Sequence, residues 1–126
     1  MAISNRDRIG KALDVLSKAL LPYISDQLYR NIGSNWQNNL PPHAKNLNDV
    51  SVLLGLFMEH WRNIFKKLLS DSDRAYISEL KEARNKWAHA EPMSSDDVDR
   101  YLDTAIRLCK NINAVNCLLN GRMKKG

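Results

Sequence analysis

Residues 49–69 read DVSVLLGLFMEHWRNIFKKLL, and this stretch decides the expected fold. Its apolar residues recur at steps of three and four, the period of an amphipathic helix. They are Val50, Leu53, Leu54, Phe57, Trp61, Ile64, Phe65 and Leu68. Leu56 widens the apolar face, as expected for a helix that touches several neighbours. The stretch therefore predicts one long central helix from Asp49 to Leu69.

Helical periodicity is also found on the N-terminal side of this stretch. Ser4 and Asp7 resemble a capping box, and an apolar stripe follows from residue 9 to residue 20. Pro22 either kinks this helix or opens a second one in its first turn, and we favour a second, short helix that ends at Gly33. Residues 33–48 are polar and contain two adjacent prolines, so they predict a long loop with Trp36 folded back onto the core.

Two more helices are expected on the C-terminal side. The first runs from about Arg74 to His89 and ends before Pro92, which disfavours helical geometry in the residue that precedes it. Ser94 and Asp97 form a second capping box, which opens a last helix to about residue 120. No segment alternates with the two-residue period of a half-buried strand. The sequence thus predicts an all-α fold, an antiparallel bundle of about five helices.

The length and composition of the chain indicate a single domain. The 126 residues fit one domain, with an ordered core of about residues 4–120 and a basic tail at residues 121–126. No apolar run approaches the roughly 18 residues that span a bilayer, and the N-terminus lacks the apolar segment of a signal peptide. We therefore expect a soluble, cytoplasmic protein without membrane contact. The net charge of +5 permits an anionic partner such as nucleic acid but does not require one.

Common signatures of cofactor and metal sites are missing. The chain has no GxxxxGK[ST], GxGxxG, HExxH or GxSxG motif. Its two cysteines, Cys109 and Cys117, lie eight residues apart in the expected last helix, where the rise of about 12 Å is too long for a disulfide. We expect both to be reduced, and neither has a partner at metal-ligand spacing. The sequence predicts no cofactor and no bound metal.

Residues 84–89, RNKWAH, carry the candidate chemistry. Asn85 and His89 are four residues apart and share a helix face, and Arg84 has the reach to converge with His89. Arginine can offer paired hydrogen bonds to a phosphate, and histidine can donate or accept a proton. In RNA the 2′-hydroxyl is itself a nucleophile, so this chemistry would need no metal. Spacing alone fits a plain helix end better, with Arg84 paired to a carboxylate and His89 solvated.

The context of the motif adds a family resemblance. Residues 82–89, EARNKWAH, followed by EPMSSDD at residues 91–97, resemble the HEPN superfamily (higher eukaryotes and prokaryotes nucleotide-binding domains), in which an Arg, a polar residue and a His lie on a late helix of an all-α bundle. The NRDR opening at residues 5–8 looks like one branch. That branch is found at the N-terminus of large prokaryotic defence ATPases or helicase-like proteins and in a fungal RNA-surveillance endoribonuclease. The resemblance covers about residues 4–119.

The resemblance implies a homodimer that places two copies of the motif at a shared cleft. It also implies a metal-independent endoribonuclease, in which Arg84 binds phosphate, His89 handles protons and Asn85 orients them, with RNA as the substrate. Many members are inactive. The alternative is therefore a non-catalytic dimerisation or interaction module, fused to or associated with a larger ATPase or helicase-like protein.

Overall fold

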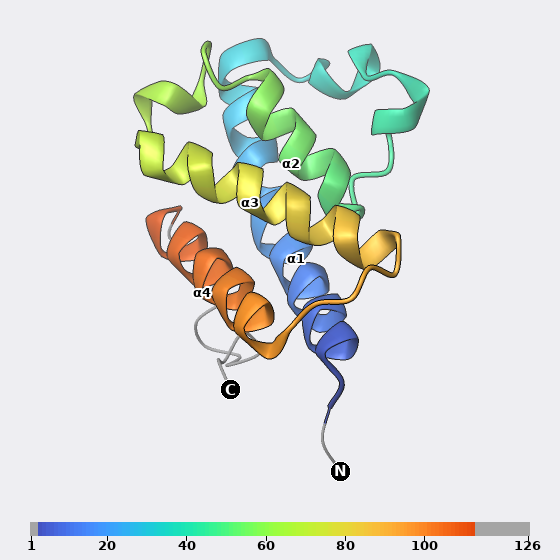
Figure 1. The fold of residues 1–126 in the computed structure, drawn as a ribbon. Helices are drawn as coiled ribbons and strands as arrows, with labels where there is room; N and C mark the ends of the chain where they lie inside the picture. The colour runs from blue at the N-terminus through green and yellow to red at the C-terminus, as the bar shows by residue number, and fades with distance from the viewer. Residues whose placement is uncertain (1–2, 113–126) are drawn as a thin grey trace.

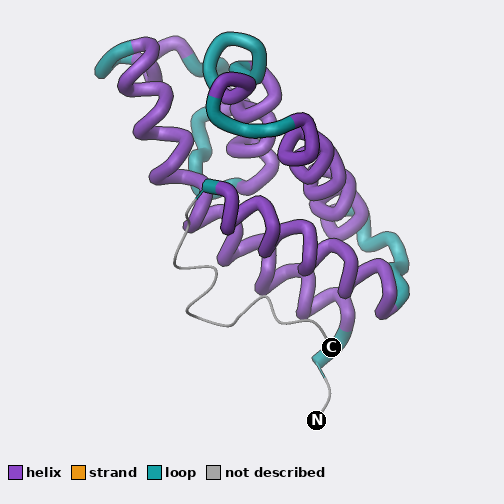
Figure 2. The backbone as a smooth tube through the Cα atoms, turned by 90° about the vertical axis from the view of Figure 1, so that its left-hand side faces the viewer, coloured by secondary structure: helices purple, strands orange, loops and turns teal. Residues whose placement is uncertain are grey.

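The computed structural model describes residues 3–112, which form four α-helices and three short 3-10 turns (Figure 1). The helices are α1 (Asn5–Ile32), α2 (Val50–Glu59), α3 (Asp71–Ala88) and α4 (Ser95–Asn111). The 3-10 turns are η1 (Trp36–Asn39), η2 (Pro42–Ala44) and η3 (Phe65–Lys67). Figure 2 shows helices and loops but no strand in this part of the chain. The all-α class is confirmed, with four α-helices in place of about five.

The difference in helix number comes from Pro22, which neither ends α1 nor opens a new helix. Helix α1 runs without a break through Pro22 and is 28 residues long in total. A proline inside a helix removes one backbone hydrogen bond and costs about 3 kcal/mol. Leu20, Ile24 and Leu28 are all 0% exposed, so the buried stripe continues on both sides of the proline. Burial of this stripe offsets the lost hydrogen bond, and one long helix is formed.

The predicted central helix is shorter than expected. Helix α2 ends at Glu59 with His60 as its C-cap, and the chain then forms turns before η3. In these turns the N–H groups of Phe65 and Lys66 donate to the carbonyls five residues earlier, of His60 and Trp61. The α-helical hydrogen-bond pattern is interrupted, but the backbone keeps coiling, so Trp61, Ile64 and Phe65 are still buried. The prediction of one helix to Leu69 is wrong. Its apolar stripe is buried as predicted up to Phe65, but Leu68 is 50% exposed.

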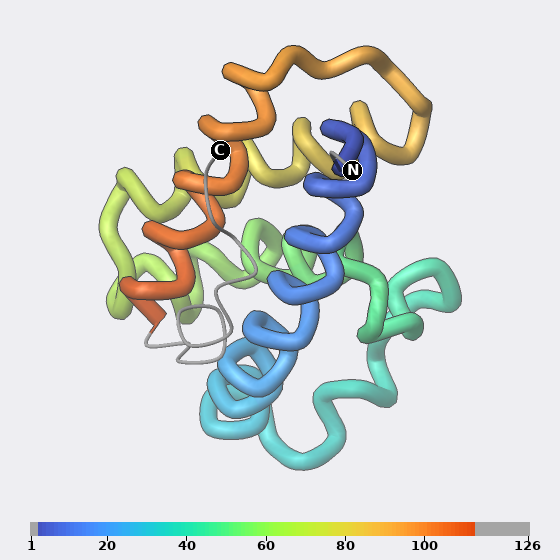
Figure 3. Tube along the Cα trace, turned by 90° about the horizontal axis from the view of Figure 1, so that it is seen from below, coloured from blue at the N-terminus to red at the C-terminus, as the bar shows by residue number. Residues whose placement is uncertain are grey.

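The four helices pack around one core. Helix α1 contacts α2 and α4, α3 contacts the same two helices, and α1 also touches α3. Helices α3 and α4 run in opposite directions, which agrees with an antiparallel arrangement (Figure 1). Seen from below, the first turns of α1 lie beside the C-terminal end of α3, and the α3–α4 connection passes around them (Figure 3). The loop after α1 packs Trp36 onto the core with 6% exposure, as predicted.

Side-chain caps define where the later helices begin. Ser70 with Asp73 and Ser94 with Asp97 both form reciprocal capping boxes, the second of which was predicted. Buried Asp73 has a further role, because its second carboxylate oxygen accepts a hydrogen bond from the amide of Asn111 in the last turn of α4. One carboxylate therefore caps α3 and ties it to the end of α4.

Two expectations for the C-terminal region change. Helix α4 ends at Asn111, earlier than predicted, and residues 113–126, which include the predicted basic tail at 121–126, lie outside the described residues. Cys109 is buried and disulfide-bonded, so the expectation that it is reduced is wrong. That expectation assumed a single helix through both cysteines, and Cys117 lies outside the described residues. Within residues 3–112, no helix is both long and apolar enough to cross a membrane.

Candidate functional site

The last turn of α3 positions the predicted motif. His89 is the C-cap, and its N–H donates to the carbonyl of Asn85 at 3.0 Å. Ala90 follows with φ of 54°, and the N–H groups of Ala90 and Glu91 donate to the carbonyls of Trp87 and Lys86. This pattern is a Schellman motif, which normally places glycine at the position that Ala90 occupies. The motif fixes the point at which His89 leaves the helix.

Arg84 forms a tertiary ion pair. Its guanidinium Nη2 lies 3.3 Å from Oδ2 of Asp49, and the two side chains are 26% and 31% exposed. The other carboxylate oxygen of Asp49 caps α2 by accepting hydrogen bonds from the N–H and hydroxyl groups of Ser51. Asp49 thus links the start of α2 to the end of α3 and holds Arg84 between them.

Arg84 and Trp87 face an open groove between α1, α3 and the loop that precedes α2. We call it the Trp87 groove; its volume is about 330 Å³ and it is lined by Gly10, Leu13, Asp14, Ser17, Asn46, Asn48, Asp49, Val50, Arg84 and Trp87. A second hollow of about 400 Å³ shares Gly10, Asp14 and Trp87 with the first, so the two hollows adjoin along α1.

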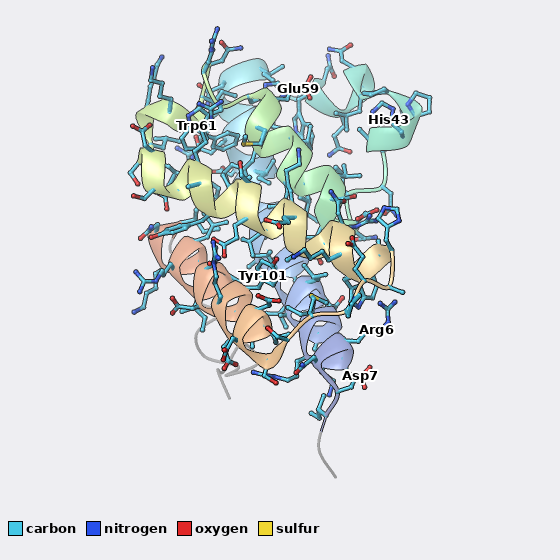
Figure 4. All side chains as sticks on the ribbon, in the orientation of Figure 1. Arg6, Asp7, His43, Glu59, Trp61 and Tyr101 are labelled. Carbon is cyan, nitrogen blue, oxygen red and sulfur yellow. The ribbon has the colours of Figure 1, made fainter. Side chains whose placement is uncertain are left out.

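The indole of Trp87 is held by the N-terminal half of α1. A Cβ atom at Gly10 would lie 3.1 Å from its Nε1 atom, so the ring rests closely on the helix backbone at that residue. The guanidinium of Arg6 lies 5.0 Å from the ring centroid and donates to the carbonyl of Trp87 at 2.6 Å. Figure 4 shows Arg6 beside the C-terminal end of α3. The first turns of α1 therefore hold the side chain and the carbonyl of Trp87 in place.

The structure does not join the three predicted site residues through their side chains. Asn85 and His89 are exposed, and neither side chain forms a hydrogen bond or ion pair with another residue in the range 3–112. Arg84 instead pairs with Asp49, as the plain helix-end interpretation expected of an arginine in this position. One chain therefore presents Arg84 in a groove, with His89 and Asn85 at the exposed end of the same helix.

Lys86, inside the motif, contacts two neighbouring side chains. It lies 3.6 Å from Glu82 and 5.9 Å from the ring centroid of Tyr101 on α4. The neighbouring hydroxyl of Tyr101, and to a lesser extent the charges of Glu82 and Asp97, raise the pKa of the Lys86 ammonium above its ordinary value. Lys86 is therefore protonated at neutral pH and acts as a fixed positive charge on this side of α3.

Sequence reasoning missed three residues that shape the site. Arg6, Gly10 and Asp49 are separated from the motif by 35 or more positions, and only the tertiary fold brings them to it. The sequence pattern before α2 can identify Asp49 as a helix cap, but it does not indicate that Asp49 also pairs with Arg84. Within residues 3–112, no group of three or more His, Cys, Asp and Glu side chains is arranged to hold a metal ion.

The strained residue beside His89 leads to a prediction. We expect Ala90→Gly to raise the free energy of unfolding by about 1 kcal/mol. Glycine adopts positive φ without the steric cost that alanine incurs, and this gain is larger than the loss from the greater entropy of glycine in the unfolded chain. Urea denaturation measures this. Ala88→Gly, two residues earlier inside α3, is the matched control and should lower the same free energy by up to about 1 kcal/mol. A destabilised Ala90→Gly variant would contradict the Schellman geometry.

Comparison with known proteins agrees with the resemblance that the motif suggested. A family model described as Swt1-like HEPN matches residues 11–113, which includes the whole of α2, α3 and α4 and most of α1. No curated protein and no solved structure matches the chain. The matched range contains Arg84, Asn85 and His89, at the end of a late helix in an all-helical domain. The chain belongs to the Swt1-like HEPN family.

Proposed function

We propose that this chain is a metal-independent, RNA-cleaving HEPN domain that acts as a cytoplasmic homodimer in a defence or nucleic-acid-processing system. The family supports an RNase-type domain, and HEPN domains typically dimerise and bind RNA. The observation that carries the proposal is the placement of Arg84. Its guanidinium is partly exposed at an open groove, and His89, five residues later, is exposed with no side-chain partner among residues 3–112.

The proposed reaction is an intramolecular transfer within the RNA. The 2′-oxygen forms a bond to phosphorus, the bond from phosphorus to the 5′-oxygen breaks, and a 2′,3′-cyclic phosphate and a 5′-hydroxyl result. One His89 takes the proton of the 2′-hydroxyl, and the His89 of the second copy gives a proton to the departing 5′-oxygen. Arg84 stabilises the negative charge on the phosphorane oxygens, and Asn85 orients the imidazole. A dimer is needed because each chain offers a single motif histidine.

One observation favours a second candidate function. Within a single chain Arg84 is neutralised by Asp49, and no side-chain bond connects it to His89 among the described residues. A domain in which this ion pair is permanent would be a non-catalytic dimerisation or interaction module, fused to or associated with a larger ATPase or helicase-like protein. The two functions differ in whether the purified chain cleaves RNA.

The cleavage assay also tests independence from metal. We expect the purified chain to cleave a long single-stranded RNA at an unchanged rate after exhaustive chelation, because Arg84 and His89 supply the charge stabilisation and proton transfer. Gel analysis of the RNA with and without chelator measures this. Loss of activity that stoichiometric zinc or manganese restores would contradict the proposal. No cleavage under any condition would favour the interaction module.

We predict a homodimer, and light scattering at micromolar concentration should report twice the monomer mass of 14.4 kDa. The prediction rests on the family and not on a visible interface. Trp87 packs on its own chain, and the large exposed apolar residues among residues 3–112 lie outside α3 and α4, the late helices that carry and follow the motif. These are Ile3, Tyr29, Ile32 and Leu68. A monomer that persists at high concentration would argue strongly against a site shared between two chains.

A further inference from the structure

The Trp87 groove presents hydrogen-bond donors that have no partner among residues 3–112. The indole Nε1 of Trp87 donates to no described residue, and it is not among the buried atoms that lack a partner, so it keeps some exposure to solvent. Arg84 uses only Nη2 for its bond to Asp49, which leaves its other N–H groups for a ligand. Two donors that line one groove suit a ligand group with several acceptor oxygens.

The second hollow adds charged side chains of both signs. Its lining includes Arg6 and Lys11, and neither is paired with a carboxylate in the described part of the chain. Its acidic residues are Asp7 and Asp14. Asp14 is paired with Lys18 at 3.1 Å, as Asp49 of the Trp87 groove is paired with Arg84. The two hollows together present the cations Arg6, Lys11 and Arg84 beside three carboxylates, two of which are already paired.

The size and the planar groups of the groove favour a nucleotide. A volume of about 330 Å³ lies at the lower end of the range of small-ligand sites, roughly 300–1,000 Å³. The indole of Trp87, under the flat guanidinium of Arg6, provides an aromatic wall, and bases stack on such surfaces without sequence preference. Asn46 and Asn48 also line the groove, and their side-chain amides can donate to and accept from a base or ribose.

We propose that the Trp87 groove binds one nucleotide of a single-stranded RNA, whose phosphate bonds to Arg84 and to the indole N–H of Trp87 and displaces Asp49 from Arg84. This inference rests on the proposed function, because it names where the RNA strand lies relative to the motif. Asp49 then has two effects. It positions the guanidinium at the groove in the free protein, and it competes with the phosphate for it.

If Asp49 competes with the phosphate for Arg84, removing the charge of Asp49 should strengthen RNA binding. Asp49→Asn removes the negative charge but keeps a side-chain oxygen for the cap of α2, and asparagine caps helices as well as aspartate. We expect this variant to bind RNA more tightly, by roughly threefold or more, because Arg84 no longer has a charged partner. The effect should disappear when Arg84 is alanine. A carboxylate that acted only as a cap would leave RNA affinity unchanged.

A second variant tests the indole N–H. Trp87→Phe keeps an aromatic ring between Gly10 and Arg6 and removes the donor, so RNA affinity should fall by about tenfold, as for loss of a bond to a charged acceptor. Matched controls lie elsewhere in the chain. Asp26→Asn breaks an exposed ion pair near the end of α1, and Trp61→Phe alters a buried tryptophan after α2. Neither control should change RNA affinity.

The experiment is fluorescence anisotropy of the full chain with a short single-stranded RNA whose 2′-hydroxyls are methylated, so that binding is measured without cleavage. Tighter binding by Asp49→Asn, only when Arg84 is present, and weaker binding by Trp87→Phe would support the proposal. If Arg84→Ala weakens binding but Asp49→Asn and Trp87→Phe do not change it, the groove proposal is wrong and the proposed function stands. If wild type does not bind RNA, both are wrong. Binding of an acidic peptide in place of RNA, with the same dependence on Trp87, would overturn the proposal in favour of a protein partner.

Discussion

Replacing His89 with alanine is expected to lower the rate of RNA cleavage by about a hundredfold or more, the usual effect of losing one proton-transfer group. The fold should not change, because the side chain of His89 is exposed and bonds to no residue in the described range. The free energy of unfolding should change by no more than about 1 kcal/mol, as surface substitutions usually do. Single-turnover cleavage of a labelled RNA measures the rate, and circular dichroism measures the fold.

Arg84→Ala serves as the companion variant, with a different pattern. It should lower the cleavage rate and also weaken RNA binding, because it removes a fork-shaped phosphate ligand. It also leaves Asp49 without its cationic partner, so a loss of stability of up to about 1 kcal/mol is expected. Arg84→Lys keeps the positive charge but loses the fork-shaped guanidinium, so it shows which of the two properties RNA binding needs.

Equal cleavage by wild type and His89→Ala would indicate a contaminating nuclease.

The largest expected effect on stability comes from the aromatic centre of the core. Phe57 is 0% exposed and contacts two other rings, with its ring centroid 4.5 Å from that of Phe65 and 5.9 Å from that of Tyr23. Phe57→Ala should lower the free energy of unfolding by about 3–5 kcal/mol, because it removes buried contacts and leaves a cavity. Chemical denaturation of wild type and variant measures the difference.

The matched control for Phe57→Ala is Tyr29→Ala on α1. Tyr29 is 60% exposed, so its loss should change stability by less than about 0.5 kcal/mol. The pair tests whether α2 and the turns after it form the centre of the fold. A loss below about 1 kcal/mol for Phe57→Ala would place this side chain outside the core and contradict the packing of α1, α2 and η3.

The burial pattern of the helices could be predicted from apolar periodicity, whereas their ends could not. Trp61, Ile64 and Phe65 are buried as predicted, although α2 ends before them, because wider backbone turns keep the same side facing inward. Pro22 shows the opposite error. Its local preference favoured a helix start, but the buried residues on both sides of it outweigh that preference. Local rules identify the residues of the core, and tertiary packing decides where a helix continues.

The candidate site was predictable only in part, for a similar reason. The helix that carries Arg84 and His89, and its end before Pro92, follow from periodicity and backbone sterics. The partner of Arg84 does not, because Asp49 is 35 residues away and belongs to another helix. The support of Trp87 by Gly10 and Arg6 likewise depends on how α1 crosses α3. These contacts decide whether Arg84 is free to bind phosphate.

The most direct test of the central claim uses wild-type protein and a chemically altered substrate. An RNA with a single 2′-deoxy nucleotide at a mapped cut site is incubated with the chain in the presence of chelator. Because the 2′-hydroxyl is the proposed nucleophile, cleavage at that linkage should stop while other sites are still cut, and the products should carry 2′,3′-cyclic phosphate ends. Continued cleavage at the 2′-deoxy linkage, or products with 3′-hydroxyl ends, would contradict the proposed mechanism.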